Sequence, residues 1–158
     1  MSVSKNIGFE QALSRAMKYC AYQERCRDEV LKKLIHWGLQ YKSEREKVLA
    51  VLEQDNFLDE YRFALHFSES KLKQNQWGKL KISAALKNKN IAEDYIHAAL
   101  ANLPEEQYWD TLVNVARKKI ETNGLETREQ EHKLKRYLQQ KGFEFDRIEK
   151  AIKEIIEK

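Results

Sequence analysis

The same helix ending occurs three times in this chain, 52 residues apart. In the first copy, Leu34 stands four residues before Gly38 and five before Leu39, and the same relation recurs in Leu86–Ile91 and Leu138–Phe143. This spacing is typical of a helix C-terminus, where Gly or Asn takes a left-handed backbone conformation and the next apolar residue folds back onto the helix. Three copies at one offset predict a tandem array of helical units.

Other apolar positions keep the same offset. Val30, Ile82 and Leu134 lie one helical turn before the three leucines, on the same helix face. We therefore predict an all-α fold of three tandem three-helix repeats with a period of 52. The expected repeats are residues 9–58, 59–103 and 104–158, in one continuous helical array.

Start and stop signals predict the helices within each repeat. The expected spans are 9–22, 27–37, 43–54, 59–74, 79–89, 92–102, 104–120, 127–141 and 145–156. Capping boxes are predicted at Ser43–Glu46 and Thr127–Gln130, because each pairs a hydroxyl residue with Glu or Gln three positions later. Residues 121–126, which include Asn123 and Gly124, are predicted to be the only longer loop.

Composition agrees with a helical protein that is not an enzyme. One Pro and five Gly are too few for a β-sandwich or barrel, and charged residues make up 34% of the chain. No Gly-rich phosphate loop, nucleophile elbow or Cys/His pairing is present, so we expect neither catalysis nor a cofactor. The two cysteines and four scattered histidines lack metal-ligand spacing, so we expect reduced thiols and no metal site.

The hydropathy of the chain predicts a cytoplasmic protein. No apolar stretch approaches the 18 residues that suggest a membrane span, so no membrane partner is expected. The first six residues also lack the apolar segment of a secretory signal.

Positive charge is concentrated in one part of the chain. Residues 70–92 contain six lysines and no acid, although the net charge of the whole chain is only +4. Lys81 recurs one repeat later as Lys133, and Lys89 recurs as Lys141. These residues could form a basic strip over the second and third repeats that faces a polyanion, or they could belong to ordinary solvated helix faces. Trp77, inside this stretch, could stack on a base or pack against neighbouring helices.

Several motifs in order resemble the RecX family, the bacterial regulators of the RecA recombinase. Residues 56–64, with the sequence NFLDEYRFA, resemble the family signature GYLDDxRFA, with Asn-Phe in place of Gly-Tyr. The family pattern RxxSxxELxxKLxxxG is matched at Glu29, Lys33, Leu34 and Gly38, with Cys26 in place of Ser, and residues 133–143 resemble KxxRYLxxRGF. The resemblance runs from about Ala12 to Ile152, nearly the whole chain.

The resemblance implies an elongated, curved array that docks in the groove of a RecA–single-stranded DNA filament. It implies inhibition of recombinase, ATPase and coprotease activity by a monomer that contacts RecA and single-stranded DNA, with at most weak duplex binding. The candidate contact residues are Arg62, Lys73, Lys79, Lys81, Lys87, Lys89, Lys133, Lys135, Arg136 and Lys141. Two alternatives stay open, namely a helical nucleic-acid-binding protein that acts without RecA and a helical-repeat scaffold for a protein partner.

Overall fold

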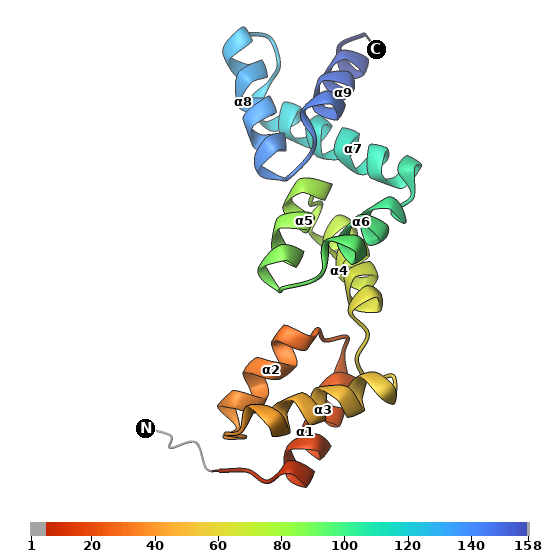
Figure 1. Cartoon of the computed structure of the whole chain (residues 1–158). Coiled ribbons are helices and arrows are strands. Elements are labelled where there is room, and N and C mark those ends of the chain that lie inside the picture. Colours follow the sequence, from red (N-terminus) through yellow and green to blue (C-terminus); the bar gives the residue numbers. More distant parts are fainter. Residues whose placement is uncertain (1–5, 158) are drawn as a thin grey trace.

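The structure, a computed structural model, describes residues 6–157, which form nine α-helices and no strand (Figure 1). The first five residues, on which the expectation about a secretory signal mainly rests, lie outside the described range. The helices are α1 (Phe9–Tyr22), α2 (Arg27–His36), α3 (Lys42–Gln54), α4 (Glu60–Asn75), α5 (Lys79–Asn88), α6 (Glu93–Ala101), α7 (Glu105–Asn123), α8 (Arg128–Gln140) and α9 (Phe145–Glu157).

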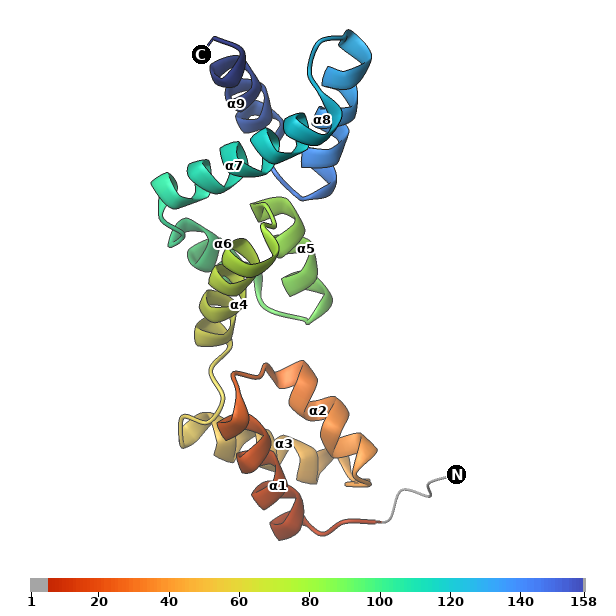
Figure 2. The same cartoon turned by 180° about the vertical axis from the view of Figure 1, so that it is seen from behind.

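The helices form three successive groups, which we call unit 1 (α1–α3), unit 2 (α4–α6) and unit 3 (α7–α9). The units are stacked end to end in an elongated column, with α1 and α9 at opposite ends (Figures 1 and 2). The all-α prediction and the three-helix repeats are thus confirmed.

The repeated helix endings have the predicted geometry. Gly38, Asn90 and Gly142 take positive φ angles of 93°, 61° and 99°. In each ending the N–H of the following residue donates to the carbonyl of the leucine five residues before it, at 3.0–3.2 Å. This bond, which closes a Schellman motif, satisfies a carbonyl that the helix leaves without a partner, and the leucine side chain is buried in all three units.

The capping predictions have different outcomes. The Thr127 box is confirmed, because the Thr127 hydroxyl accepts from the Gln130 N–H (3.1 Å) and the Gln130 side-chain oxygen accepts from the Thr127 N–H (3.0 Å). The Ser43 box is wrong. Helix α3 already begins at Lys42, since the Tyr41 carbonyl accepts the first helical bonds.

The predicted loop at 121–126 is also shorter than expected. Helix α7 continues to Asn123, and Gly124, with a φ of 79°, ends it. The Asn-Gly pair therefore acts as a helix stop rather than as part of a longer loop.

The buried side chains form two separate cores. Ten buried residues of unit 1, among them Val30, Leu34 and Leu52, pack together. Units 2 and 3 share a second core, in which Ile82 and Leu86 of unit 2 join Tyr108 and other side chains of unit 3. Cys26 is the only buried residue of unit 1 that belongs to this second core. Units 2 and 3 are therefore fused by apolar packing, whereas unit 1 is largely self-contained.

Candidate nucleic-acid interface

The fused pair, units 2 and 3, meets through backbone groups. The helix-ending turn of unit 3 lies against the N-terminus of α5, where the Gly78 N–H donates to the Lys141 carbonyl (2.7 Å) and the Leu80 N–H donates to the Gly142 carbonyl (3.0 Å). A Cβ atom added to Gly78 would lie 2.3 Å from the Gly142 carbonyl carbon. The close approach therefore requires glycine at this position.

Tyr108 of α7 reinforces the same junction. Its buried hydroxyl accepts from the Lys79 N–H (2.9 Å) and donates to the Glu144 carboxylate. Burial and the hydrogen bond to Glu144 raise the pKa of Tyr108. The Lys79 ammonium lies 4.9 Å from the centre of the Tyr108 ring, so this candidate contact residue is held at the junction.

The junction between units 1 and 2 has equivalent positions but different chemistry. The N–H of Arg27, one period before Lys79, donates to the Glu60 carboxylate (2.9 Å) rather than to a tyrosine hydroxyl. Asn90, one period before Gly142, donates from its side chain to the Asp28 carboxylate (2.9 Å). This junction is held by side chains, many of them charged.

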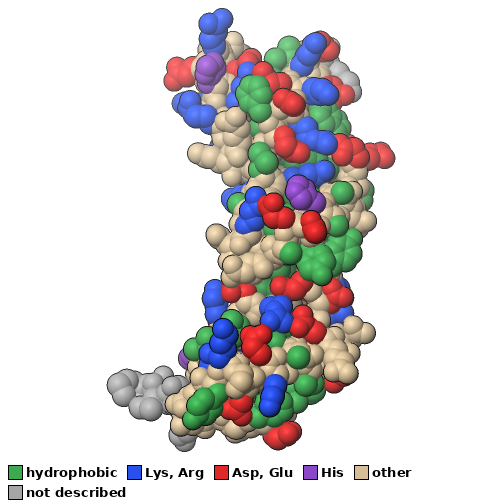
Figure 3. Space-filling model, in the orientation of Figure 1, with side chains coloured by type: hydrophobic (Ala, Val, Ile, Leu, Met, Phe, Trp, Pro, Cys, Tyr) green, Lys and Arg blue, Asp and Glu red, His purple; other side chains and the backbone are tan. Residues whose placement is uncertain are grey.

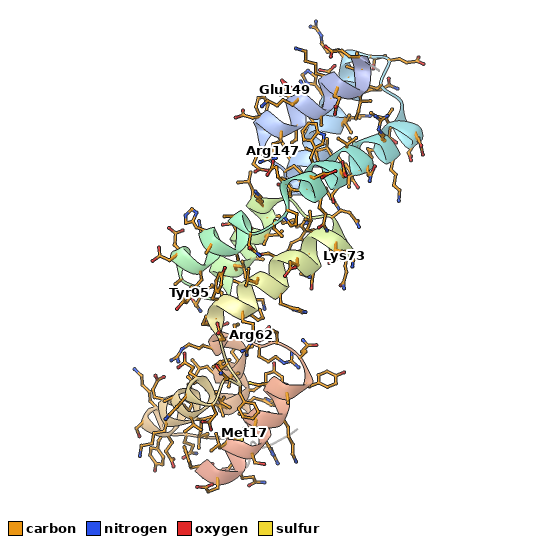
Figure 4. The ribbon with its side chains drawn as sticks, turned by 90° about the vertical axis from the view of Figure 1, so that its right-hand side faces the viewer. Met17, Arg62, Lys73, Tyr95, Arg147 and Glu149 are labelled. Carbon is orange, nitrogen blue, oxygen red and sulfur yellow. The ribbon has the colours of Figure 1, made fainter. Side chains whose placement is uncertain are left out.

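Two sequence-predicted site residues serve this first junction. Arg62, labelled in Figure 4, forms an ion pair with Glu24 of unit 1 (2.8 Å). Lys89 forms one with Glu29 of α2 (3.0 Å). Burial is the largest single influence on the Lys89 pKa and acts to lower it, but the hydrogen bond to Glu29 and the attraction of Glu29 and other nearby groups together raise the Lys89 pKa.

The other sequence-predicted cations fall into three groups. Lys87 pairs with Glu93, Lys135 pairs with Glu131 and Glu149, and Lys141 donates to the Asn75 carbonyl of unit 2 (2.8 Å). Lys79 and Lys81 lie over aromatic rings. The side chains of Lys73, Lys133 and Arg136 make no hydrogen bond or ion pair within residues 6–157.

One pair of cations that recurs at the same repeat position links neighbouring units. Lys89 and Lys141, one period apart, each reach back to the preceding unit. On the face shown in Figure 3, basic and acidic side chains are interspersed along the column. The continuous basic strip over units 2 and 3 stays a prediction.

Trp77 is half-buried and packs against the shared core of units 2 and 3. The ammonium groups of Lys71 and Lys81 lie 4.7 and 4.6 Å from the centre of its ring. With its ring occupied by these contacts, Trp77 fits the packing interpretation better than base stacking.

A groove of about 690 Å³ is lined by residues of α4, α7 and α8 and of the turns that follow α4 and α8. In the ribbon, α7 lies next to the C-terminal end of α4 and to α8 (Figure 2). Its lining is mainly polar and basic. The lining residues are Leu72, Lys73, Gln76, Thr111, Asn114, Val115, Arg117, Lys118, Lys119, Glu121, Thr122, Tyr137 and Lys141. Five of these side chains are cations and one is a carboxylate, so the formal charge of the lining is +4, equal to that of the whole chain.

The groove cations have no acidic partners among the described residues. Lys73 projects from the C-terminal end of α4 (Figure 4), and neither it nor Arg117 nor Lys118 has a side-chain hydrogen bond or ion pair within residues 6–157. The Lys119 ammonium lies 4.3 Å from the centre of the Tyr137 ring. Burial, with repulsion from Lys81, lowers the pKa of Lys141. The groove is therefore a concave surface with uncompensated positive charge.

Sequence reasoning found only part of this groove. Lys73 and Lys141 were among the predicted contact residues, whereas Arg117, Lys118 and Lys119 were not. Three consecutive cations in the predicted helix 104–120 were the available signal. These three cations lie in α7, outside the acid-free stretch at residues 70–92.

Comparison with known proteins identifies the family. The model of the second three-helix domain of RecX matches residues 59–100, and that of the third matches residues 105–152. Together these matches cover more than half of the chain. The chain belongs to the RecX family. This is a family of regulatory proteins and not of enzymes.

Curated RecX relatives match most of the chain at moderate identity. Regulatory protein RecX of Lactococcus lactis subsp. cremoris (strain SK11) is 29% identical over 140 residues, which cover 87% of this chain and 52% of the relative. RecX of Prosthecochloris aestuarii is 28% identical over 146 residues, which cover 92% of this chain and 94% of the relative. The chain thus spans about half the length of some RecX relatives and nearly all of others.

A solved RecX structure shows the same fold. The crystal structure of RecX from Lactobacillus salivarius matches with a TM-score of 0.83 at 22% identity, covering 92% of this chain and 95% of the other. Among the described residues, no helix has both the length and the apolar character needed to cross a membrane.

Proposed function

We propose that this chain regulates a RecA recombinase by binding the filament that the recombinase forms on single-stranded DNA, and that its effect is inhibitory. The observation that carries the proposal is membership of the RecX family, whose curated relatives are named regulatory proteins. The ordered motifs that resemble the family support the same partner.

The architecture is compatible with this function. A column of similar units presents related surfaces at regular intervals, which suits a partner that is itself a repeating helical assembly (Figure 1). The side chains of three predicted contact residues, Lys73, Lys133 and Arg136, have no hydrogen bond or ion pair within residues 6–157 and are available to a partner. The other predicted contact residues hold the units together, contact aromatic rings or form ion pairs within a unit, so replacing them would change folding as well as binding.

An assay of DNA-dependent ATP hydrolysis by the cognate RecA tests the proposal. Increasing amounts of the chain should lower the rate of hydrolysis. Inhibition well below one copy per recombinase monomer would indicate that the chain blocks filament ends, and inhibition near parity would indicate that it coats the filament groove. Unchanged ATPase activity, filament length and strand exchange at saturating concentrations would refute the proposal.

A second function, nucleic-acid binding without a recombinase, is favoured by one observation. The groove between α4, α7 and α8 offers cations without needing a protein partner. Tight binding to duplex DNA, with no effect on RecA in the same assay, would favour this alternative.

A further inference from the structure

We infer that the groove between α4, α7 and α8 binds the phosphate backbone of single-stranded DNA. The inference rests on the proposed function for its biological setting, but it names a site that the family match does not assign. Three features of the groove support it, namely its charge, the type of its polar groups and its shape.

Charge is the first argument. Lys73, Arg117 and Lys118 have no acidic partner among the described residues, and Lys141 is held close enough to Lys81 that repulsion contributes to its lowered pKa. Like charges gathered in a concave surface repel one another until an anion enters. A polyanion would relieve this repulsion and release its own counterions, which is the main source of sequence-independent affinity for DNA.

The neutral polar groups are the second argument. The Asn114 amide lines the groove beside the cations and can donate to phosphate oxygens. The Thr111 hydroxyl and the Gln76 amide also line the groove, but they already donate to backbone carbonyls. Tyr137 is the only aromatic side chain in the lining, and Lys119 already lies over its ring. With no open aromatic face for base stacking, the groove should hold the backbone and leave the bases outside. Binding should therefore depend little on base sequence.

Shape decides between a single strand and other polyanions. The cations come from α4, α7 and the turn that follows α8, around a cavity of about 690 Å³, so a flexible strand can enter and meet them from several sides. The phosphates of a rigid duplex would reach only the rim. An acidic protein segment would normally need an apolar anchor, and the apolar lining is limited to Leu72, Val115 and part of Tyr137.

The test compares two triple variants of the full chain. The groove variant carries Lys73→Gln, Arg117→Gln and Lys118→Gln, at three exposed positions. The control variant carries Lys18→Gln, Lys42→Gln and Lys47→Gln, which are exposed in unit 1 and have no hydrogen bond or ion pair from their side chains within residues 6–157. Both sets remove the same charge. Unchanged helicity by circular dichroism should confirm that both variants fold.

Fluorescence anisotropy of a labelled oligothymidylate at several salt concentrations gives the binding readout. Each phosphate contact on a single strand contributes about 0.7 to the slope of log affinity against log salt, so three lost contacts should flatten the slope by about 2. The control variant should keep the wild-type slope. Equal weakening in both variants would mean that only net charge matters and would overturn the inference. An unchanged slope in the groove variant would do the same, as would failure of the wild type to bind the oligonucleotide at low salt.

A fluorophore placed in the groove gives an independent readout. Asn114→Cys introduces an exposed thiol, whereas the native Cys20 and Cys26 are buried, and burial raises the pKa of these thiols to about 11 and about 12. An environment-sensitive dye on Asn114→Cys should respond to the oligonucleotide, and a dye on Ala50→Cys in α3 should not. A response at both positions, or at neither, would overturn the inference.

Parallel RecA ATPase measurements separate this inference from the proposed function. If the groove loses DNA binding as expected but the wild type leaves RecA unaffected, the groove stands and the regulatory function fails. If the wild type inhibits RecA while the groove variant keeps its DNA affinity and salt slope, the function stands and the groove fails.

Discussion

Replacing Gly78 with Ala should specifically weaken the fused pair of units 2 and 3. The added Cβ would lie 2.3 Å from the Gly142 carbonyl carbon and 2.4 Å from the Phe143 backbone nitrogen. Real Cβ atoms do not approach other atoms so closely, and the obstructing atoms belong to the backbone of a tight turn that cannot rotate away. The turn and the N-terminus of α5 would therefore have to separate.

The size of the effect can be worked out from the contacts that would be lost. Two hydrogen bonds cross this junction between backbone groups, at 2.7 and 3.0 Å. At about 1 kcal/mol each, their loss would cost about 2 kcal/mol. Overpacking typically adds about 1–3 kcal/mol. A destabilisation of about 3–5 kcal/mol is therefore expected, which lowers the melting temperature of a protein of this size by about 6–20 °C.

Thermal unfolding followed by circular dichroism measures this change. Gly8→Ala is the matched control, because an added Cβ at Gly8 would meet no atom within 4 Å and the backbone φ of −80° suits alanine. Because Gly8 is the N-cap of α1, where alanine is less favourable than glycine, the control should lose at most about 1 kcal/mol relative to the wild type. If Gly78→Ala melts like the wild type, the tight backbone junction does not hold units 2 and 3 together and the reasoning is wrong.

Three further predictions concern charges and thiols. Lys89→Met should destabilise the chain by about 1 kcal/mol in low-salt denaturant unfolding, and the loss should shrink as salt rises. Lys81→Met should raise the pKa of Lys141, measured by NMR titration, because burial and Lys81 lower that pKa in the folded state. The free energy of unfolding of the wild type should therefore increase as the pH rises through the folded-state pKa of Lys141, and that of the variant should increase less. Cys20 and Cys26, with pKa values raised by burial to about 11 and about 12, should react with a thiol reagent near pH ~8 only after unfolding.

The fold was accessible from the sequence because its strongest signals are local. A left-handed Gly or Asn after a buried leucine specifies a helix ending within six residues, and the period of 52 repeats that signal three times. The misses were at boundaries where a competing local bond decided the outcome. At α3 the Tyr41 carbonyl accepts the first helical bonds, so the helix begins before Ser43.

The site was less accessible because it depends on contacts between distant residues. Lys89 and Lys141 are equivalent in sequence, yet one pairs with Glu29 and the other donates to the Asn75 carbonyl, so neither is simply an exposed cation. The groove brings α4 together with α7 and α8, which only the packing of unit 3 on unit 2 can do. A single sequence shows the charges but not the partners that neutralise them.

The two junctions also set the order in which the chain can fold during synthesis. Unit 1 completes its core with Leu58, so it can fold as soon as those residues leave the ribosome. Helices α4 and α5 are made next, but the backbone donors at Gly78 and Leu80 find their acceptors only when Lys141 and Gly142, more than 60 residues later in the chain, have emerged. We therefore expect a nascent chain in which unit 1 is folded while unit 2 stays incompletely packed until unit 3 has been synthesised.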